Sequence, residues 1–351
     1  MSMKYGRIGQ TAWNRSIRKQ LHTIRDEVIL SPSPQNACGG IRYMAPETDH
    51  GSSEEETEET VFLWADVRVS GNSPNIGYYA ILQAAGELAA QGICMTGVSV
   101  RVLLPPGSEE EDLKELAAGI EEACRRMEIQ VSSIQGEVTS AVTICTVFVS
   151  GAGAGEKKAL PAACPLDGGE ILLCGYVGLE GTLRILDEAE DELETRFVPS
   201  FLAQTKELRR ELVIPDQLLR ATDARGRIRA IRQIGSGGIL AALWDLAEEL
   251  DTGFEADLSA MALRQETVEI CEFYRLNPYQ MTSAGSFLIV TEHGDAVLDV
   301  LEKAGARAGR LGVIKAHRAR VISSGEEIRY LDRPAPDELE VWMSGRQFGR
   351  K

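Results

Sequence analysis

Two glycine-bounded turns are the stretches of this sequence whose residue types and spacing best suit the binding of an anion. The first is Gly178-Leu179-Glu180-Gly181-Thr182, which leads from an expected strand into an expected helix. The second, Gly235-Ser236-Gly237-Gly238, also opens a helix. Backbone N–H groups at the start of a helix lack a partner within the helix and can bind phosphate oxygens. The same turns also fit simple corners where glycine supplies a positive φ, and both interpretations stay open.

Cysteine and histidine form no recognisable reactive pattern. The seven cysteines are dispersed, odd in number and without a Cys-x-x-Cys pair. This is typical of buried, reduced thiols rather than of a disulfide framework or a zinc site. The four histidines form no spaced cluster, so we expect neither a structural zinc ion nor a Ser-His-Asp triad.

The elements that must position any site are clearest between residues 75 and 127. Apolar residues recur at three- and four-residue steps from Ile81 to Leu88 and then form the compact run from Val98 to Leu104. This pattern predicts a helix followed by a buried strand. A second helix follows, with acidic residues at 109–112 in its first turn, where the helix dipole favours negative charge.

The chain as a whole predicts two domains. A break in composition at Gly151-Ala152-Gly153-Ala154-Gly155 favours a boundary between residues 152 and 168. We therefore expect domains at 1–155 and 165–335, with residues 336–351 as a short tail. Strands and helices interleave without a regular βαβ period, which favours α+β layers over a doubly wound sheet.

Composition and charge exclude several classes of function. A chain of 351 residues with 44% hydrophobic and 26% charged residues is typical of a globular protein with two cores. A net charge of −16 argues against nucleic acid as a partner, because such binding depends on Lys and Arg. No apolar run approaches the roughly 20 residues needed to span a bilayer, and the first residues lack the apolar core of a signal peptide. We therefore expect a cytoplasmic protein with no membrane partner.

Several segments resemble the aminoimidazole ribonucleotide (AIR) synthase superfamily. In the first half the matching segments are Asn75-Ile76-Gly77, residues 87–92 and residues 103–107. In the second half they are Gly178–Thr182, Gly237-Gly238 and residues 282–289. The superfamily includes thiamine-monophosphate kinase, selenophosphate synthetase and a hydrogenase maturation factor that dehydrates a thiocarboxamide. The resemblance is closest to the AIR synthase-related and hydrogenase-maturation branch.

The resemblance implies a two-domain PurM-like architecture. Its amino-terminal half is a mixed sheet with helices that forms a barrel with a second copy, and its carboxyl-terminal half is an α/β sandwich. A homodimer built on strands near 61–69, 97–104 and 141–149 is therefore expected. The resemblance also implies nucleotide-binding positions, which fall on Asn75, Gly77, Gly178, Glu180, Gly181, Thr182, Gly237 and Gly238.

ATP chemistry in this superfamily depends on carboxylates that hold magnesium against the phosphates. Carried over position by position, the ligands that remain are Asp66, Glu87 and Glu137. The family's metal-loop aspartate falls on Ala37, and its second-domain aspartate falls on Gln233. Magnesium needs several oxygen ligands in near-octahedral geometry, so these replacements predict a depleted magnesium-ATP site.

The leading hypothesis is an AIR synthase-related, hydrogenase maturation-like protein with a degenerate nucleotide site. It would act as a binding or partner subunit, with a paralogue or a maturation protein as its partner. No cysteine follows Cys271, so we do not expect the maturation factor's dehydration by the family's route, which uses a final cysteine. The alternative is a magnesium-ATP-dependent dehydratase, ligase or kinase acting on a small molecule or amide, in which Asp66, Glu87 and Glu137 still clamp the cation.

Overall fold

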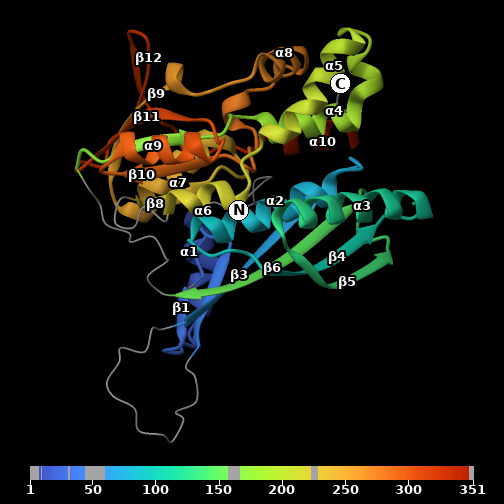
Figure 1. Ribbon diagram of the computed structural model, residues 1–351, viewed down its shortest axis with the longest axis horizontal. Coiled ribbons are helices and arrows are strands. Elements are labelled where there is room, and N and C mark those ends of the chain that lie inside the picture. Colours follow the sequence, from blue (N-terminus) through green and yellow to red (C-terminus); the bar gives the residue numbers. More distant parts are fainter. Residues whose placement is uncertain are drawn as a thin grey trace, which may run out of the picture.

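The computed structural model describes residues 8, 10–30, 32–43, 60–156, 167–222 and 228–347. They form two mixed sheets, one in each half of the chain, with a long buried helix between them (Figure 1). This confirms the expected α+β architecture of two domains.

The first sheet is open on one face. Its strands, in the order β1-β2-β3-β6-β4-β5, are β1 (Val28–Leu30), β2 (Cys38–Tyr43), β3 (Thr60–Ser70), β6 (Thr146–Glu156), β4 (Gly97–Leu104) and β5 (Gln130–Val138). Along β3 the side chains alternate strictly, so that Leu63 is buried while Phe62 is exposed. Helices α2 (Ile76–Ala90) and α3 (Glu110–Met127) pack on the buried face (Figure 1). Within the described ranges, the only helix contact recorded for the opposite face is at the end of β3, where Arg68 pairs with Glu340 of helix α10 (Glu338–Gln347).

The glycine-rich stretch at 151–155 lies inside β6, not after it. A Cβ at Gly151 would lie 2.0 Å from the Sδ of Met95, and one at Gly153 would lie 2.1 Å from the carbonyl oxygen of Cys94. These glycines allow the connection between α2 and β4 to cross close over the strand. The composition break is therefore a packing requirement within the first domain. Most of the range expected for the boundary, residues 157–166, falls outside the described residues.

The second sheet is covered on both faces. Its strands, in the order β13-β12-β9-β11-β7-β10-β8, are β13 (Glu327–Tyr330), β12 (Arg320–Ser324), β9 (Gly253–Asp257), β11 (Ala308–Lys315), β7 (Glu170–Cys174), β10 (Phe287–Thr291) and β8 (Ile228–Gln233). Leu173 of β7 points toward helix α7 (Gly238–Leu250), and Leu172 points toward the opposite layer. That layer contains α6 (Pro215–Thr222) and α9 (Gly294–Lys303).

A cluster of helices closes one end of the second domain. It contains α4 (Leu179–Leu193), α5 (Pro199–Glu207), α8 (Gln265–Tyr274) and α10 (Glu338–Gln347). The expectation of a tail after residue 335 is wrong for the part that is described, because α10 is a helix whose Leu339 and Trp342 are buried in this cluster. Shorter elements are α1 (Gln10–Ser16), η1 (Arg18–Gln20), η3 (Leu208–Glu211), η4 (Leu258–Ala260) and η5 (Pro278–Gln280). None of the described helices has the length and apolar character that a membrane crossing requires.

Helix α2 belongs to both domains. Of its 15 residues 13 are buried, because it lies between the first sheet and the second domain. Ile81 and Leu88 pack into the first core, whereas Ala89 and Ala90 pack into the second. A helix that is apolar nearly all round is typical of such an interior position.

Candidate functional site

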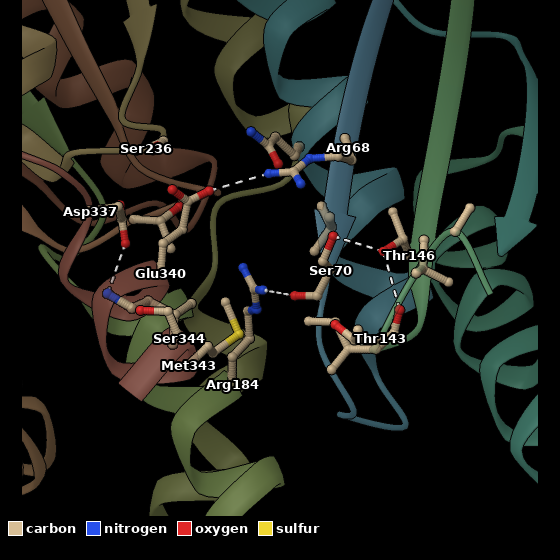
Figure 2. A pocket seen from close by; sticks show the side chains of 17 residues that line it. Arg68, Ser70, Thr143, Thr146, Arg184, Ser236, Asp337, Glu340, Met343 and Ser344 are labelled. Atoms are coloured by element: carbon tan, nitrogen blue, oxygen red, sulfur yellow. Dashed lines mark hydrogen bonds and ion pairs between the residues drawn. The ribbon is translucent and has the colours of Figure 1, made fainter. Parts of the chain in front are cut away.

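A cavity of about 300 Å³ lies between the two domains. One wall consists of the end of β3 and the connection from β5 to β6, and the other consists of α4, α10 and the turn before α7 (Figure 2). Its volume is at the lower end of the range for small-molecule sites, about 300–1,000 Å³. The cavity is therefore large enough to be a candidate site for a small molecule.

Two arginines bring positive charge into this cavity. Arg68 of β3 pairs with Glu340 of α10 at 3.4 Å across the cavity (Figure 2). Arg184 of α4 donates to the carbonyl oxygen of Ser70 at 2.7 Å and to the carboxylate of Glu180 at 3.1 Å. Arg184 is only 7% exposed, and its Nε is buried without a hydrogen-bond partner in the described structure. A buried guanidinium N–H without an acceptor is costly. The Nε atoms of Arg229, Arg232 and Arg320 are buried in the same way, so this feature does not by itself identify a ligand.

Asp337 is the acid of the opposite wall. Its carboxylate accepts the backbone N–H of Gly237 at 2.6 Å and that of Leu339 at 2.9 Å. Burial raises the pKa of Asp337 to about 7, with smaller contributions from the negative charges of Glu180 and Glu340. A carboxyl group with this pKa can hold or release a proton near neutral pH.

The cavity is lined by charged groups of both signs, since Arg68 is paired with Glu340 and Arg184 with Glu180. Its guanidinium groups can bind phosphate or carboxylate oxygens, and hydroxyl groups of Ser70, Thr146 and Ser236 line it. Among the described residues, no group of three or more His, Cys, Asp or Glu side chains has an arrangement that could hold a metal ion.

The three magnesium ligands expected from the family resemblance are not brought together. Asp66 lies on the open face of the first sheet, where the hydroxyl of Ser150 donates to it. Glu87 projects from α2 on the opposite side of that sheet and accepts a hydrogen bond from Gln233 at 3.0 Å. Glu137 shares the open face with Asp66 but lies three strands away, and the strand register places it level with Ser70, so the two carboxylates are farther apart than the roughly 14 Å that three spacings of about 4.8 Å give. Within one chain, these carboxylates do not fit a magnesium ion.

The turn Gly178–Thr182 is a packed corner. The N–H of Gly178 donates to the hydroxyl of Ser283 at 2.7 Å, and that of Gly181 donates to Thr282 O at 3.2 Å. The hydroxyl of Thr182 donates to Gly178 O at 2.8 Å. Glu180 is 2% exposed and is paired with Arg184. These contacts are internal, and they favour the corner interpretation over anion binding at this turn.

The other expected nucleotide positions also have structural partners. The amide of Asn75 donates to Asp187 at 3.0 Å, and its oxygen accepts from Arg209, which links α2 to the second domain. A Cβ at Gly77 would lie 2.6 Å from Ile120, so this glycine allows α2 and α3 to approach. Gly238 has a φ of +66° and lies against the backbone of η5. The N–H of Gly237 is directed to Asp337, which lines the cavity, but Gly237 itself is not one of the lining residues.

Sequence reasoning missed the residues that give the cavity its charge. Arg68 lies two positions after Asp66 and therefore on the same face of β3, a signal that strand alternation supplies. Arg184 lies four residues after Glu180, which is the spacing of a helical ion pair. Asp337 carried no comparable signal, because the segment around it resembled a tail.

The two mixed sheets, the shared helix and the cleft between the domains define a two-domain α+β protein of the PurM-like class. Models of known protein families match both halves of the chain. Residues 58–156 match the model "AIR synthase related protein, N-terminal domain", and residues 167–323 match "AIR synthase related protein, C-terminal domain". The chain belongs to the AIR synthase-related family.

Individual relatives are distant. A putative hydrogenase expression/formation protein of Methanocaldococcus jannaschii is 23% identical over 271 residues, which are 76% of this chain and 78% of the relative. Carbamoyl dehydratase HypE of Rhizobium leguminosarum bv. viciae is 25% identical over 286 residues, which are 79% of this chain and 77% of the relative.

Solved structures with low sequence identity share the fold. AaThiL complexed with AMPPCP and TMP has a TM-score of 0.67 at 13% identity, and the match covers 96% of this chain and 98% of that one. The hydrogenase maturation protein HypE in complex with ATP has a TM-score of 0.61 at 17% identity, with coverage of 84% and 89%. A HypE–HypF complex contains a chain with a TM-score of 0.66 at 16% identity, with coverage of 78% and 90%.

Proposed function

We propose that this chain is a HypE-like member of the AIR synthase-related family with a degenerate nucleotide site, and that it acts as a binding or partner subunit. The observation that carries the proposal is the separation of the carboxylates. Asp66 and Glu87 lie on opposite sides of the first sheet, and Asp66 and Glu137 lie three strands apart. A magnesium ion needs oxygen ligands about 2.0–2.1 Å away, so these carboxylates cannot share one ion within a chain.

Titration calorimetry with magnesium and AMPPCP tests this proposal directly. We expect no binding at micromolar strength or better, and a HypE protein serves as the positive control because a HypE structure contains ATP. Binding of magnesium–AMPPCP at micromolar strength would overturn the degenerate-site proposal.

The partner role extends this proposal. A HypE relative forms a complex with HypF, and by analogy this chain would bind a maturation protein or a catalytic paralogue.

The open face of the first sheet also supports a homodimer. It exposes Ile41, Phe62 and Phe148, and exposed apolar patches are typical of interaction surfaces.

A magnesium-ATP-dependent enzyme of the AIR synthase or HypE type is the second candidate, and one observation favours it. Asp66 and Glu137 both lie on the open face, so a second copy packed there would supply further carboxylates to each. This alternative expects ADP release with an amide or small-molecule acceptor. Asp66→Ala should abolish that release, and Asp332→Ala, at an exposed acid of the second domain, should not. Equal turnover in both variants would reject the assignment of Asp66.

A further inference from the structure

One ion pair of the interdomain cavity is loose enough to accept a ligand between its members. Arg68 of β3 and Glu340 of α10 come from opposite walls, and the nitrogen–oxygen distance between them is 3.4 Å (Figure 2). Charge-assisted hydrogen bonds of this kind are usually about 2.7–2.9 Å long. The side chain of Arg68 is 54% exposed and that of Glu340 is 27% exposed, so water weakens their attraction. The two side chains can therefore separate at little cost.

The other charged groups of the cavity are already engaged. Arg184 is only 7% exposed, and its charge is matched by Glu180 at 3.1 Å. Both carboxylate oxygens of Asp337 accept backbone N–H groups. A ligand therefore meets one available guanidinium and one available carboxylate, those of Arg68 and Glu340.

This pair of opposite charges selects against ligands that carry only one charge. An anion bound to Arg68 would face the carboxylate of Glu340, and a cation bound to Glu340 would face the guanidinium of Arg68. Each would leave one side chain without its partner, and such unpaired charges lower affinity. A zwitterion compensates both side chains. In an α-amino acid the carboxylate and the ammonium group are attached to the same carbon, so one molecule can enter between two side chains that lie this close together.

The remaining walls fit an uncharged, apolar body. Apolar side chains from the connection between β5 and β6 and from α10 contribute to the lining. They are Ala141, Val142, Ile144, Leu339 and Met343. The hydroxyl groups of Ser70 and Thr146 bond to each other at 3.0 Å, so they do not need a partner from a ligand. The volume of about 300 Å³ suits a small molecule.

We propose that the interdomain cavity binds a free α-amino acid with an apolar side chain, whose carboxylate pairs with Arg68 and whose ammonium group pairs with Glu340. The ligand takes the place of the direct contact between these two residues and leaves both charges compensated. The proposal names a ligand class for the binding role proposed above, and it rests on that role only in treating the interdomain cavity as the binding site.

L-Leucine is the probe, and two analogues each lack one of its charges. Titration calorimetry should detect binding of leucine to the full chain. It should show at least tenfold weaker binding of 4-methylpentanoate, which lacks the ammonium group, and of 3-methylbutylamine, which lacks the carboxylate. No binding of leucine at millimolar concentration, or equal affinities for the three compounds, would overturn the proposal.

Variants that remove one charge identify the two residues by a change of preference. Arg68→Gln should weaken leucine binding at least tenfold and bind 3-methylbutylamine more tightly than the wild type, because Glu340 then lacks its partner. Glu340→Gln should also weaken leucine binding, but it should bind 4-methylpentanoate more tightly. A loss of folding alone would not produce these opposite gains.

The matched control is Arg101→Gln, which removes an exposed arginine of β4 that does not line the cavity. It should bind leucine as the wild type does. Leucine affinity that is unchanged in both Arg68→Gln and Glu340→Gln would reject the assignment. Because magnesium and nucleotide are absent, failure of this test leaves the degenerate-site proposal standing, and magnesium–AMPPCP binding leaves this one standing.

Discussion

Burial of Asp337 makes the stability of this protein depend on pH near neutrality. The pKa of this carboxyl group is raised from 3.8 to about 7 in the folded chain, so the folded state holds the proton more tightly than the unfolded state. The stability that protonation supplies is fully present below about pH 4 and is lost as the pH rises to 7. The neighbours that contribute negative charge are Glu180 and Glu340.

Asp337→Asn should remove this dependence, since the amide does not ionise. Between about pH 5 and pH 7.5, the unfolding free energy of the wild type should fall by about 2.5 kcal/mol relative to the variant, at 1.36 kcal/mol per pKa unit. Urea denaturation at both pH values measures the difference. Parallel pH profiles for the two proteins would show that the carboxyl group does not titrate in this window.

Gly238 tests the steric requirement of the turn before α7. A Cβ at this position would lie 2.5 Å from Tyr279 O and 2.7 Å from the backbone N of Met281, and φ is +66°. Gly238→Ala should therefore destabilise the protein by about 2–4 kcal/mol. This value adds the free-energy cost of overpacking to the cost of holding alanine in a left-handed backbone conformation. Gly309→Ala is the matched control, because its Cβ would meet nothing within 4 Å. Similar denaturation midpoints for the two variants would contradict the packing argument.

At the scale of single elements, Asn75 is one of the side chains that join α2 to α4. Asn75, at the start of α2, bonds to Asp187 of α4 and to Arg209. Burial raises the pKa of Asp187, so removing the amide leaves this acid with fewer compensating hydrogen bonds.

Asn75→Ala should lower the unfolding free energy by about 1–3 kcal/mol, the usual cost of leaving buried polar groups unpaired. Asn72→Ala provides the control. The side chain of Asn72 is exposed, and its contact with Glu188 is made by the backbone N–H. Denaturant titration of both variants checks the prediction, which fails if Asn75→Ala is as stable as Asn72→Ala.

The sequence predicted elements better than it predicted the positions of their side chains. Alternation in β3 and the compact run of β4 are local signals, and both strands lie where they were expected. The glycines of β6 were misread because the contact that requires them, with Cys94 and Met95, is nonlocal. Helix α10 was missed for the same reason, since Leu339 and Trp342 are buried in a cluster of helices that lie far from them in the sequence.

The candidate site was harder to predict than the fold. Family resemblance selected Gly237 but could not show that Asp337, 100 residues later, accepts its N–H. The resemblance also selected Asp66, Glu87 and Glu137 by position along the chain. Whether carboxylates converge depends on the face of the sheet that each one occupies and on the distance between their strands. The order of the strands in the sheet decides this distance, and it is not visible in the sequence.

At the scale of the whole molecule, the open face of the first sheet determines the expected assembly. Phe62 lies beside Ile41 on β2 and contacts Trp64 with ring centroids 6.4 Å apart. This apolar surface has no helix over it in the described ranges, and a second copy would cover it. The homodimer remains a proposal that the oligomeric state in solution can test.

Phe62→Glu should convert the proposed dimer to a monomer, since a charge at the centre of the interface would lose its water without gaining a partner. Light scattering after size-exclusion chromatography measures the mass. Ile328→Glu on β13, where the side chain is 75% exposed and far from this face, should leave the assembly intact. A wild-type protein that is already monomeric at high concentration would reject the dimer.

Helix α2 contributes side chains to the cores of both halves, and this arrangement affects how the molecule melts. If residues 1–156 were expressed alone, Ala89 and Ala90 would lose the apolar surroundings that now cover them, and the remaining half would be left with a gap in its own interior. Calorimetry should therefore record one heat-absorption peak instead of two. Separately produced halves should regain native spectra only when they are mixed.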